Sequence, residues 1–279
     1  MRFSLILATI NRTAELEIFL NSLKLQTFRD FELIVVDQNS DYRLAPILEN
    51  YAGVFPINNL RSEKGLSRAR NKAIMAAGGE ILAFPDDDCW YPPNLLEEIN
   101  GFFHDNSDMD GLTGKTLDHN GRPTLNRWDL KNGFINKWNI WYRVTSCSIF
   151  IRNSKVNQRI KFNETLGIGS GTPWSSSEDI DFLLQAIERG NKVYYSPEFI
   201  IRHPQTNSKS GEKAILRASQ YSVGKGRVLH IHSYPLWFIM YLIFRAQIGW
   251  FLNSLIGNQE TGLLYSSRVT GLMKGWRGS

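Results

Sequence analysis

Short apolar runs that alternate with amphipathic segments are the feature of this 279-residue chain that most restricts its fold. An apolar run at residues 3–8 stops at a polar group, residues 9–12. A helical pattern begins near Thr13, with apolar residues at the i, i+3, i+4, i+7 spacing of one face. A second apolar run occupies residues 31–36. This strand, helix, strand order predicts parallel pairing through a right-handed crossover.

The same alternation continues to residue 195. We expect helices at residues 66–77 and 177–189 and strands at residues 81–84, 146–151 and 192–195. Such a pattern predicts a three-layer α/β domain with a mainly parallel sheet. Open sheets of this kind bind ligands outside the carboxyl ends of their strands, so the polar clusters that follow the strands mark the expected site.

The sharpest of these clusters is Asp86-Asp87-Asp88, which follows the strand at residues 81–84. Three adjacent carboxylates repel one another unless a cation or several hydrogen-bond donors neutralise them. Mg²⁺ and Mn²⁺ prefer oxygen ligands and commonly bridge carboxylates to phosphates. The alternative is a solvated acidic turn that caps the next helix.

Two other acidic positions also allow two interpretations. Asp37 ends the second strand, where a carboxylate can accept hydrogen bonds from a ribose or base or simply form a turn. Glu178 and Asp179 begin a helix after three serines, a place where the helix dipole favours carboxylates. The functional interpretation is that Asp179 removes a proton from an acceptor hydroxyl.

Basic and aromatic residues add weaker signals. Arg70 lies on the helix between the acidic strand ends, where its guanidinium can meet a diphosphate or face solvent. His203 follows a strand-like segment and is either a structural residue or a ligand. Trp174 offers a face for a sugar ring or packs in a core.

Taken in order, these segments resemble the motifs of family 2 glycosyltransferases of the GT-A fold. The matching segments are residues 4–12, 25–26, 32–41, 65–71, 79–88 and 177–181. The resemblance implies a GT-A catalytic domain over residues 1–212, with a nucleotide-sugar-binding half at 1–110 and an acceptor-binding half at 111–212.

The resemblance also implies roles for individual residues. Asp37 would contact the nucleoside, and Asp179 would be the catalytic base. Asp86 and Asp88 would bind Mn²⁺ or Mg²⁺ and the donor diphosphate, with His203 as another metal ligand. The other implied donor contacts are Thr9, Asn11, Arg12, Arg70 and Asp87, and the implied acceptor contacts are Trp174 and Glu178.

One departure narrows the expected reaction. The family's processive polysaccharide synthases carry a QxxRW motif after the base, and this sequence has none there. We therefore expect inverting transfer of a single sugar from a nucleoside-diphosphate sugar, with a UDP-sugar favoured, to a lipid-linked glycan of a surface polysaccharide. The rival functions are a metal-dependent nucleotidyltransferase and a non-catalytic glycan-binding protein on the same fold.

The C-terminal segment, residues 213–279, differs in composition from the rest. Its eight Lys or Arg residues and one Glu give it a charge of +7, whereas the whole chain carries +5, so residues 1–212 carry −2. Residues 235–257 are apolar and aromatic, but Arg245, Gln247 and Asn253 interrupt them, which favours an interfacial helix over a spanning one. We expect this tail to bind an anionic membrane surface and not nucleic acid. The alternative is a helical hairpin that packs on the catalytic domain or on a second subunit of a homodimer.

The N-terminus and the two cysteines bear on location. The chain runs straight into its first strand, without the pattern of a signal peptide, and Cys89 and Cys147 form no CxxC pair. The expected location is therefore the cytoplasm, peripheral on the inner face of the cell membrane.

Overall fold

The computed structural model describes residues 1–156, 160–205, 211–255 and 257–278. The chain divides into two compact units. The first, called the sheet unit, comprises Met1–Lys64, Arg68–Phe162 and Phe182–Gln205. The second, called the helical unit, comprises Gly65–Ser67, Asn163–Asp181 and the chain after Gln205.

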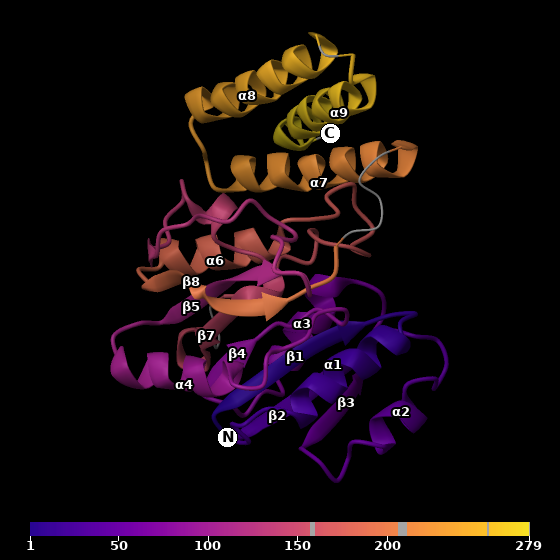
Figure 1. The fold of residues 1–279 in the computed structure, drawn as a ribbon, viewed down its shortest axis with the longest axis vertical. Coiled ribbons are helices and arrows are strands. Elements are labelled where there is room, and N and C mark those ends of the chain that lie inside the picture. Colours follow the sequence, from indigo (N-terminus) through magenta and orange to yellow (C-terminus); the bar gives the residue numbers. More distant parts are fainter. Residues whose placement is uncertain (157–159, 206–210, 256, 279) are drawn as a thin grey trace. The chain divides into compact units, whose positions relative to one another are not determined.

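The sheet unit is built on an eight-stranded sheet with the order β3-β2-β1-β4-β7-β5-β8-β6 in the described part of the chain (Figure 1). The strands are β1 (Phe3–Thr9), β2 (Phe31–Asp37), β3 (Ile57–Arg61), β4 (Ile81–Ala83), β5 (Gly111–Leu117), β6 (Gly133–Phe134), β7 (Ile149–Arg152) and β8 (Val193–Arg202). The first four pair in parallel, as do β5 and β8, whereas β7 and β6 pair antiparallel with their neighbours. The predicted α/β class with a mainly parallel sheet is confirmed.

Helices cover both faces of this sheet. They are α1 (Ala14–Lys24), α2 (Ala45–Glu49), α3 (Leu66–Ile74), α4 (Leu95–Asp105), α5 (Asn153–Val156) and α6 (Glu178–Glu188). Phe19 of α1 and Phe103 of α4 share one apolar cluster with Leu5 and Leu33 of the central strands. Successive side chains along a strand point to opposite faces of the sheet, so Phe84, which follows β4, faces away from the cluster that contains Ala83. On this other face Phe84 contacts Phe182 of α6. The sheet is therefore the middle layer of three.

Two expected strands differ in extent from those observed. The segment expected as a strand from residue 146 begins with a 3₁₀ turn, Ser146–Ser148, because Ser148 and Thr145 cap one another. The strand expected at 192–195 continues to Arg202 as β8. β3 was not expected at all, because this edge strand carries two asparagines and no run of buried residues.

The helical unit contains the expected C-terminal helices, α7 (Gly211–Ile231), α8 (Leu236–Leu255) and α9 (Gln259–Arg277). α9 packs on both others, and its backbone touches that of α7. A Cβ on Gly275 would lie 1.9 Å from the carbonyl oxygen of Val223, and one on Gly226 would lie 2.2 Å from that of Leu272. Glycine at these positions permits the close packing.

α8 differs from the other helices in its apolar composition. With a mean hydropathy of 1.2, it is the one helix of the described residues that is long and apolar enough to cross a membrane. Only 17% of its most apolar window is buried inside the protein. Length and composition alone do not distinguish a spanning helix from an interfacial one.

Candidate active site

Strand register places three polar side chains together at the carboxyl edge of the sheet. Thr9 of β1 pairs with Asp37 of β2, and Asp37 pairs with Arg61 of β3. Each residue is the last of its strand, and in β1 and β2 the sequence changes there from apolar to polar. The parallel pairing of β1, β2 and β3 therefore builds one side of the candidate site.

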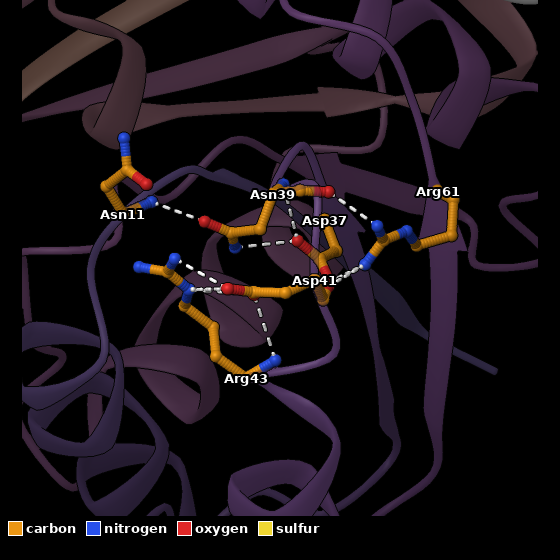
Figure 2. Close-up of polar contacts among 6 residues, drawn as sticks. All are labelled: Asn11, Asp37, Asn39, Asp41, Arg43 and Arg61. Carbon is orange, nitrogen blue, oxygen red and sulfur yellow. Dashed lines mark hydrogen bonds and ion pairs between the residues drawn. The ribbon is translucent and has the colours of Figure 1, made fainter.

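Asp37 is the centre of the hydrogen-bond network in Figure 2. Its carboxylate is 1% exposed, and its Oδ1 accepts hydrogen bonds from the backbone N–H (2.8 Å) and side-chain amide (2.7 Å) of Asn39. Its Oδ2 accepts one from Arg61 at 2.6 Å. Asn39 in turn accepts a hydrogen bond from the backbone N–H of Asn11, whose φ of 58° is left-handed. The network fixes the direction of the carboxylate.

The acidic turn lies at the end of β4 and is held by groups from other strands and helices. Asp87 accepts hydrogen bonds from Thr9 at 2.6 Å and from Arg12 at 2.7 Å, and Arg12 also pairs with Asp88. Asp86 is paired with Arg70 at 3.1 Å and with the hydroxyl of Ser146 at 3.1 Å. Arg70, which is 1% exposed, therefore supports an acidic side chain from inside the protein.

His203 reaches this turn because the chain after β8 bridges back to it. Trp90 and Arg202 exchange backbone hydrogen bonds of 2.9 and 3.0 Å, which places His203 beside Asp88. Its Nε2 lies 3.1 Å from Asp88 Oδ1, and its Nδ1 lies 2.7 Å from the carbonyl oxygen of Pro204. A carbonyl can only accept, so Nδ1 carries a proton, which fixes the ring orientation.

The structure thus brings together the three residues predicted as metal ligands. One ligand atom each from Asp86, Asp88 and His203 lies within 4.8 Å of the others. Two carboxylates and an imidazole are a donor set that suits a divalent cation such as Mn²⁺. The bond from His203 Nδ1 to a carbonyl is the outer contact that metal-binding histidines usually make. The residues present therefore fit the predicted ion.

Electrostatics in the same cluster favour positive charge. Burial raises the pKa of Asp88, but the hydrogen bond and charge of His203, with Arg12, outweigh it and lower the pKa to about 2. Burial lowers the pKa of His203, yet Asp88 and Asp86 raise it overall. Asp87 behaves differently, because burial raises its pKa to about 6 against the hydrogen bond from Thr9 and the charge of Arg12.

The predicted base lies in the helical unit, at the start of α6. Ser177 precedes it with a φ of 66°, in the left-handed region that a serine seldom adopts. Asp179 is half-buried, and its Oδ1 accepts a hydrogen bond from the N–H of Ile180 at 2.8 Å. Glu178 is buried, with its carboxylate against Gly167, where a Cβ would lie 3.1 Å from Oε2. Gly167 has a φ of 92°, so glycine suits both the backbone and the close contact.

The tail helix α7 supports this base-bearing segment within the helical unit. Ser176 donates a hydrogen bond of 2.9 Å to the carbonyl oxygen of Tyr221. A Cβ on Gly224 would lie 2.3 Å from the Oγ of Ser176, so α7 and this segment are in close contact. The guanidinium of Arg227 lies 4.2 Å from the ring centroid of Trp174. The ring of His232, just after α7, contacts buried Asp181 at 2.9 Å. Segments of chain that flank Asp179 on both sides are thus held by α7 and the turn after it.

The predicted residues divide between the two units. All predicted donor and metal residues lie in the sheet unit, and all predicted acceptor-side residues, namely Trp174, Glu178 and Asp179, lie in the helical unit. The indole N–H of Trp174 is buried and has no hydrogen-bond partner among the described residues. The roles of these residues stay predictions.

Three supporting residues were missed from the sequence: Arg61, Asn39 and Ser146. Arg61 ends a strand that has no apolar signature, so nothing marked it as a strand end. Asn39 lies in the polar cluster after β2 and was detectable by position. Ser146 was expected as the first residue of a strand, whereas it lies in a 3₁₀ turn and its hydroxyl donates a hydrogen bond to Asp86.

Sequence comparison identifies a family and several relatives. The profile described as Glycosyl transferase family 2 matches residues 4–165. The glycosyltransferase EpsH of Bacillus subtilis is 33% identical over 126 residues, which cover 41% of this chain and 36% of EpsH. TarS of Staphylococcus aureus, named as a poly(ribitol-phosphate) beta-N-acetylglucosaminyltransferase, is 32% identical over 127 residues, which cover 44% of this chain and 22% of TarS. The alignments thus span well under half the length of these relatives.

Two solved structures share the fold over nearly the whole chain. The complex of S. aureus TarS 1–349 with UDP-GlcNAc has a TM-score of 0.64 at 21% identity, covering 99% of this chain and 90% of that one. The mannosyltransferase PcManGT from Pyrobaculum calidifontis, in complex with GDP-Man and Mn²⁺, has a TM-score of 0.58 at 13% identity, covering 98% and 72%. At these identities the likeness shows the fold, and the predicted GT-A sandwich is confirmed.

Proposed function

Because the chain belongs to glycosyl transferase family 2, we propose that it transfers one sugar from a nucleoside-diphosphate sugar to a hydroxyl of a glycan acceptor. The observation that carries the proposal is the cluster of Asp86, Asp88 and His203 at the carboxyl edge of the sheet. In this cluster Mn²⁺ or Mg²⁺ would neutralise the charge that develops on the leaving diphosphate. The imidazole favours Mn²⁺ of the two, because Mg²⁺ prefers oxygen ligands alone.

The hydrogen bonds of Asp37 favour uridine as the nucleoside. Oδ1 already accepts two N–H groups of Asn39, and Oδ2 accepts one from Arg61. Each carboxylate oxygen has about two acceptor positions, so one position remains, on Oδ2. Uracil presents a single N3–H, whereas guanine presents two adjacent donors that would need both oxygens. A UDP-sugar is therefore the proposed donor, which is also the class bound by TarS.

We assign proton removal to Asp179. An acceptor hydroxyl is a weak nucleophile at neutral pH, and a carboxylate that takes its proton as the new bond forms typically accelerates such a step by about 10²- to 10⁴-fold. Asp179 lies in the first turn of α6, an end of the helix that interacts favourably with negative charge. A single displacement of this kind inverts the anomeric configuration, so an α-linked donor gives a β-linked product. Glu178 and Trp174 are assigned to the acceptor.

The names of the relatives suggest the acceptor. By its name, TarS acts on poly(ribitol-phosphate). We propose a surface glycan on a lipid carrier as the acceptor, met at the inner face of the cell membrane. The division into a catalytic domain at residues 1–212 and a tail at 213–279 is part of the same proposal, as is a homodimer if the tail pairs with a second subunit.

A donor screen tests the proposal. Thermal unfolding should be measured with UDP-sugars and GDP-sugars, each with Mn²⁺ and with chelator, for the wild type, for Asp88→Asn and for Asp108→Asn, an exposed aspartate away from the cluster. We expect a UDP-sugar to raise the Tm only with Mn²⁺, and only in the wild type and Asp108→Asn. An unchanged shift in Asp88→Asn or in excess chelator would contradict the metal site. Release of pyrophosphate from a nucleoside triphosphate would identify a nucleotidyltransferase. Donor binding without any sugar transfer would identify a glycan-binding protein.

A further inference from the structure

α8 presents one continuous apolar face to the solvent. Its side chains follow the 3.6-residue period of the helix, and each is between 42% and 67% exposed. They are Trp237, Met240, Tyr241, Phe244, Ile248, Phe251, Leu252 and Leu255, here called the α8 face. No charged residue of α8 falls within it. Patches of this kind on soluble proteins mark surfaces that meet a partner or a membrane.

Cations lie along one edge of the α8 face. Arg245 is four residues from Tyr241 and seven from Leu252, and its guanidinium lies 5.6 Å from the Tyr241 ring centroid. Lys225 of α7 is close enough to Arg245 and to Arg268 of α9 for their charges to act on it. Burial and then these two cations lower the pKa of Lys225 to about 8. Three helices thus contribute one positive group each to the same neighbourhood.

The charge of the whole helical tail has the same sign. Helices α7, α8 and α9 carry eight Lys or Arg residues and two Glu residues, a net charge of +6. A second copy of this chain on the α8 face would bring an equal positive charge to the interface, which opposes association. An anionic lipid surface offers the complementary charge, with apolar chains beneath its phosphates.

We propose that the α8 face docks the protein in the plane of an anionic bilayer, with its apolar side chains among the acyl chains and Arg245 at the level of the lipid phosphates. Trp237 and Tyr241 belong to the residue types that favour the headgroup zone. A spanning orientation is disfavoured, because Gly249 and Trp250, which lie outside the α8 face, contact Tyr265 and Gly262 of α9. α9 in turn carries three cations, Arg268, Lys274 and Arg277. This proposal concerns binding and does not depend on the transfer reaction.

Vesicle flotation of the full chain tests it. The probes are vesicles of phosphatidylcholine alone and of phosphatidylcholine with phosphatidylglycerol. The test variant is Phe244→Ser with Phe251→Ser, which removes two exposed rings from the α8 face. The matched control is Met75→Ser with Leu130→Ser, two apolar residues of the sheet unit that are 78% and 90% exposed. Arg245→Gln tests the cationic edge separately.

We expect the wild type and the control to bind the anionic vesicles equally and the neutral ones more weakly. The test variant should lose at least about tenfold in partition coefficient with an unchanged unfolding curve, because each ring transferred from water contributes strongly to binding. Arg245→Gln should lose affinity for the anionic vesicles alone, and the bound wild type should be released by alkaline carbonate.

Three results would overturn the proposal. One is that the test variant binds the anionic vesicles as the wild type does. Another is resistance of the bound protein to carbonate, which indicates a spanning helix. The last is a dimer by light scattering that the test variant converts to a monomer, with no vesicle binding by either protein, which would assign the α8 face to a second copy.

Discussion

At the scale of single residues, Arg61 shows how an unremarkable position supports a buried charge. Asp37 is 1% exposed, so its carboxylate depends on Arg61 and Asn39 in place of water. Arg61→Met should destabilise the fold by about 1–3 kcal/mol in urea unfolding, because a buried carboxylate loses a charged hydrogen-bond donor. Donor affinity should fall with it.

Arg43→Met is the matched control for Arg61→Met. Arg43 pairs with Asp41 at 2.7 Å in the same view (Figure 2), but both of these side chains are largely exposed. Exposed ion pairs contribute little, so the control should unfold as the wild type does. Equal losses in the two variants would mean that burial of Asp37 does not decide the effect.

Lys225 predicts a pH dependence of stability. Burial and two nearby cations lower its pKa to about 8, against 10.5 for an ordinary lysine. The unfolded chain therefore keeps this proton to higher pH than the folded one, so the free energy of unfolding rises as the pH goes from 8 toward 10.5. Below pH 8 Lys225 is protonated in both the folded and the unfolded state, and the folded state is then destabilised by the full free-energy cost of the buried charge.

The comparison of Lys225→Met with the wild type isolates this effect. The variant should be more stable by on the order of 1–3 kcal/mol near pH 7, and the gap should narrow by about pH 9.5. Urea unfolding at both pH values measures it. A gap that widened with pH would show that the folded state favours the charged lysine.

The same residues show what the sequence reveals at this scale. Carboxylates such as Asp37 and Asp88 were detectable because Asp37 ends an apolar strand and Asp88 lies in the polar turn that follows another. Their partners were not detectable from the sequence. Strand register brings Arg61 beside Asp37, and a 3₁₀ turn brings Ser146 to the acidic turn. Lys225 looked like one of several basic residues, and only the packing of three helices gives it a lowered pKa.

At the scale of elements, α7 was expected to be part of a tail, and the structure places it against the base-bearing segment. Gly224 makes the closest contact, because a Cβ there would lie 2.3 Å from Oγ and 2.5 Å from the carbonyl oxygen of Ser176. Gly224→Ala should therefore lower the Tm and reduce kcat, with donor affinity little changed. Thermal unfolding and steady-state kinetics measure these effects.

Gly101→Ala is the matched control for Gly224→Ala. Gly101 lies inside α4, and nothing is within 4 Å of its Cβ position. Alanine there should be neutral or stabilising by up to about 1 kcal/mol, because it favours the helix. If both variants kept full activity, the contact between α7 and Ser176 would be irrelevant to the base.

β1, α1, β2, α3 and β4 were predictable because each carries the apolar pattern of a buried strand or of one helix face, whereas the edge strand β3 lacks such a pattern and was missed. The second half of the sheet was harder to predict. Its strands β7 and β8 pair in an order and direction that the sequence does not specify, with β7 antiparallel to both neighbours. The contacts of α7 were also hidden, because Ser176 and Gly224 are small residues without a pattern of their own.

At the scale of the whole molecule, the division into two units separates the predicted functions. Donor and metal residues belong to the sheet unit, which has its own apolar cluster. The predicted base and acceptor residues belong to the helical unit, together with α7, α8 and α9. Loss of the tail should therefore affect the two functions unequally.

A chain shortened to end at Gln205 tests this inequality. It keeps Asp37, Asp86, Asp88 and His203 with the strands that position them, so Mn²⁺-dependent UDP-sugar binding should persist within about threefold of the full chain. It lacks the contacts of α7 and His232 with the segment around Asp179, so transfer should fall by about 10²-fold or more, as for loss of a general base.

Full-length Asp179→Asn is the reference variant, because it should likewise bind donor normally and lose transfer. Normal transfer by the shortened chain would show that the base segment does not need α7, and loss of donor binding would show that the sheet unit does not hold its site alone.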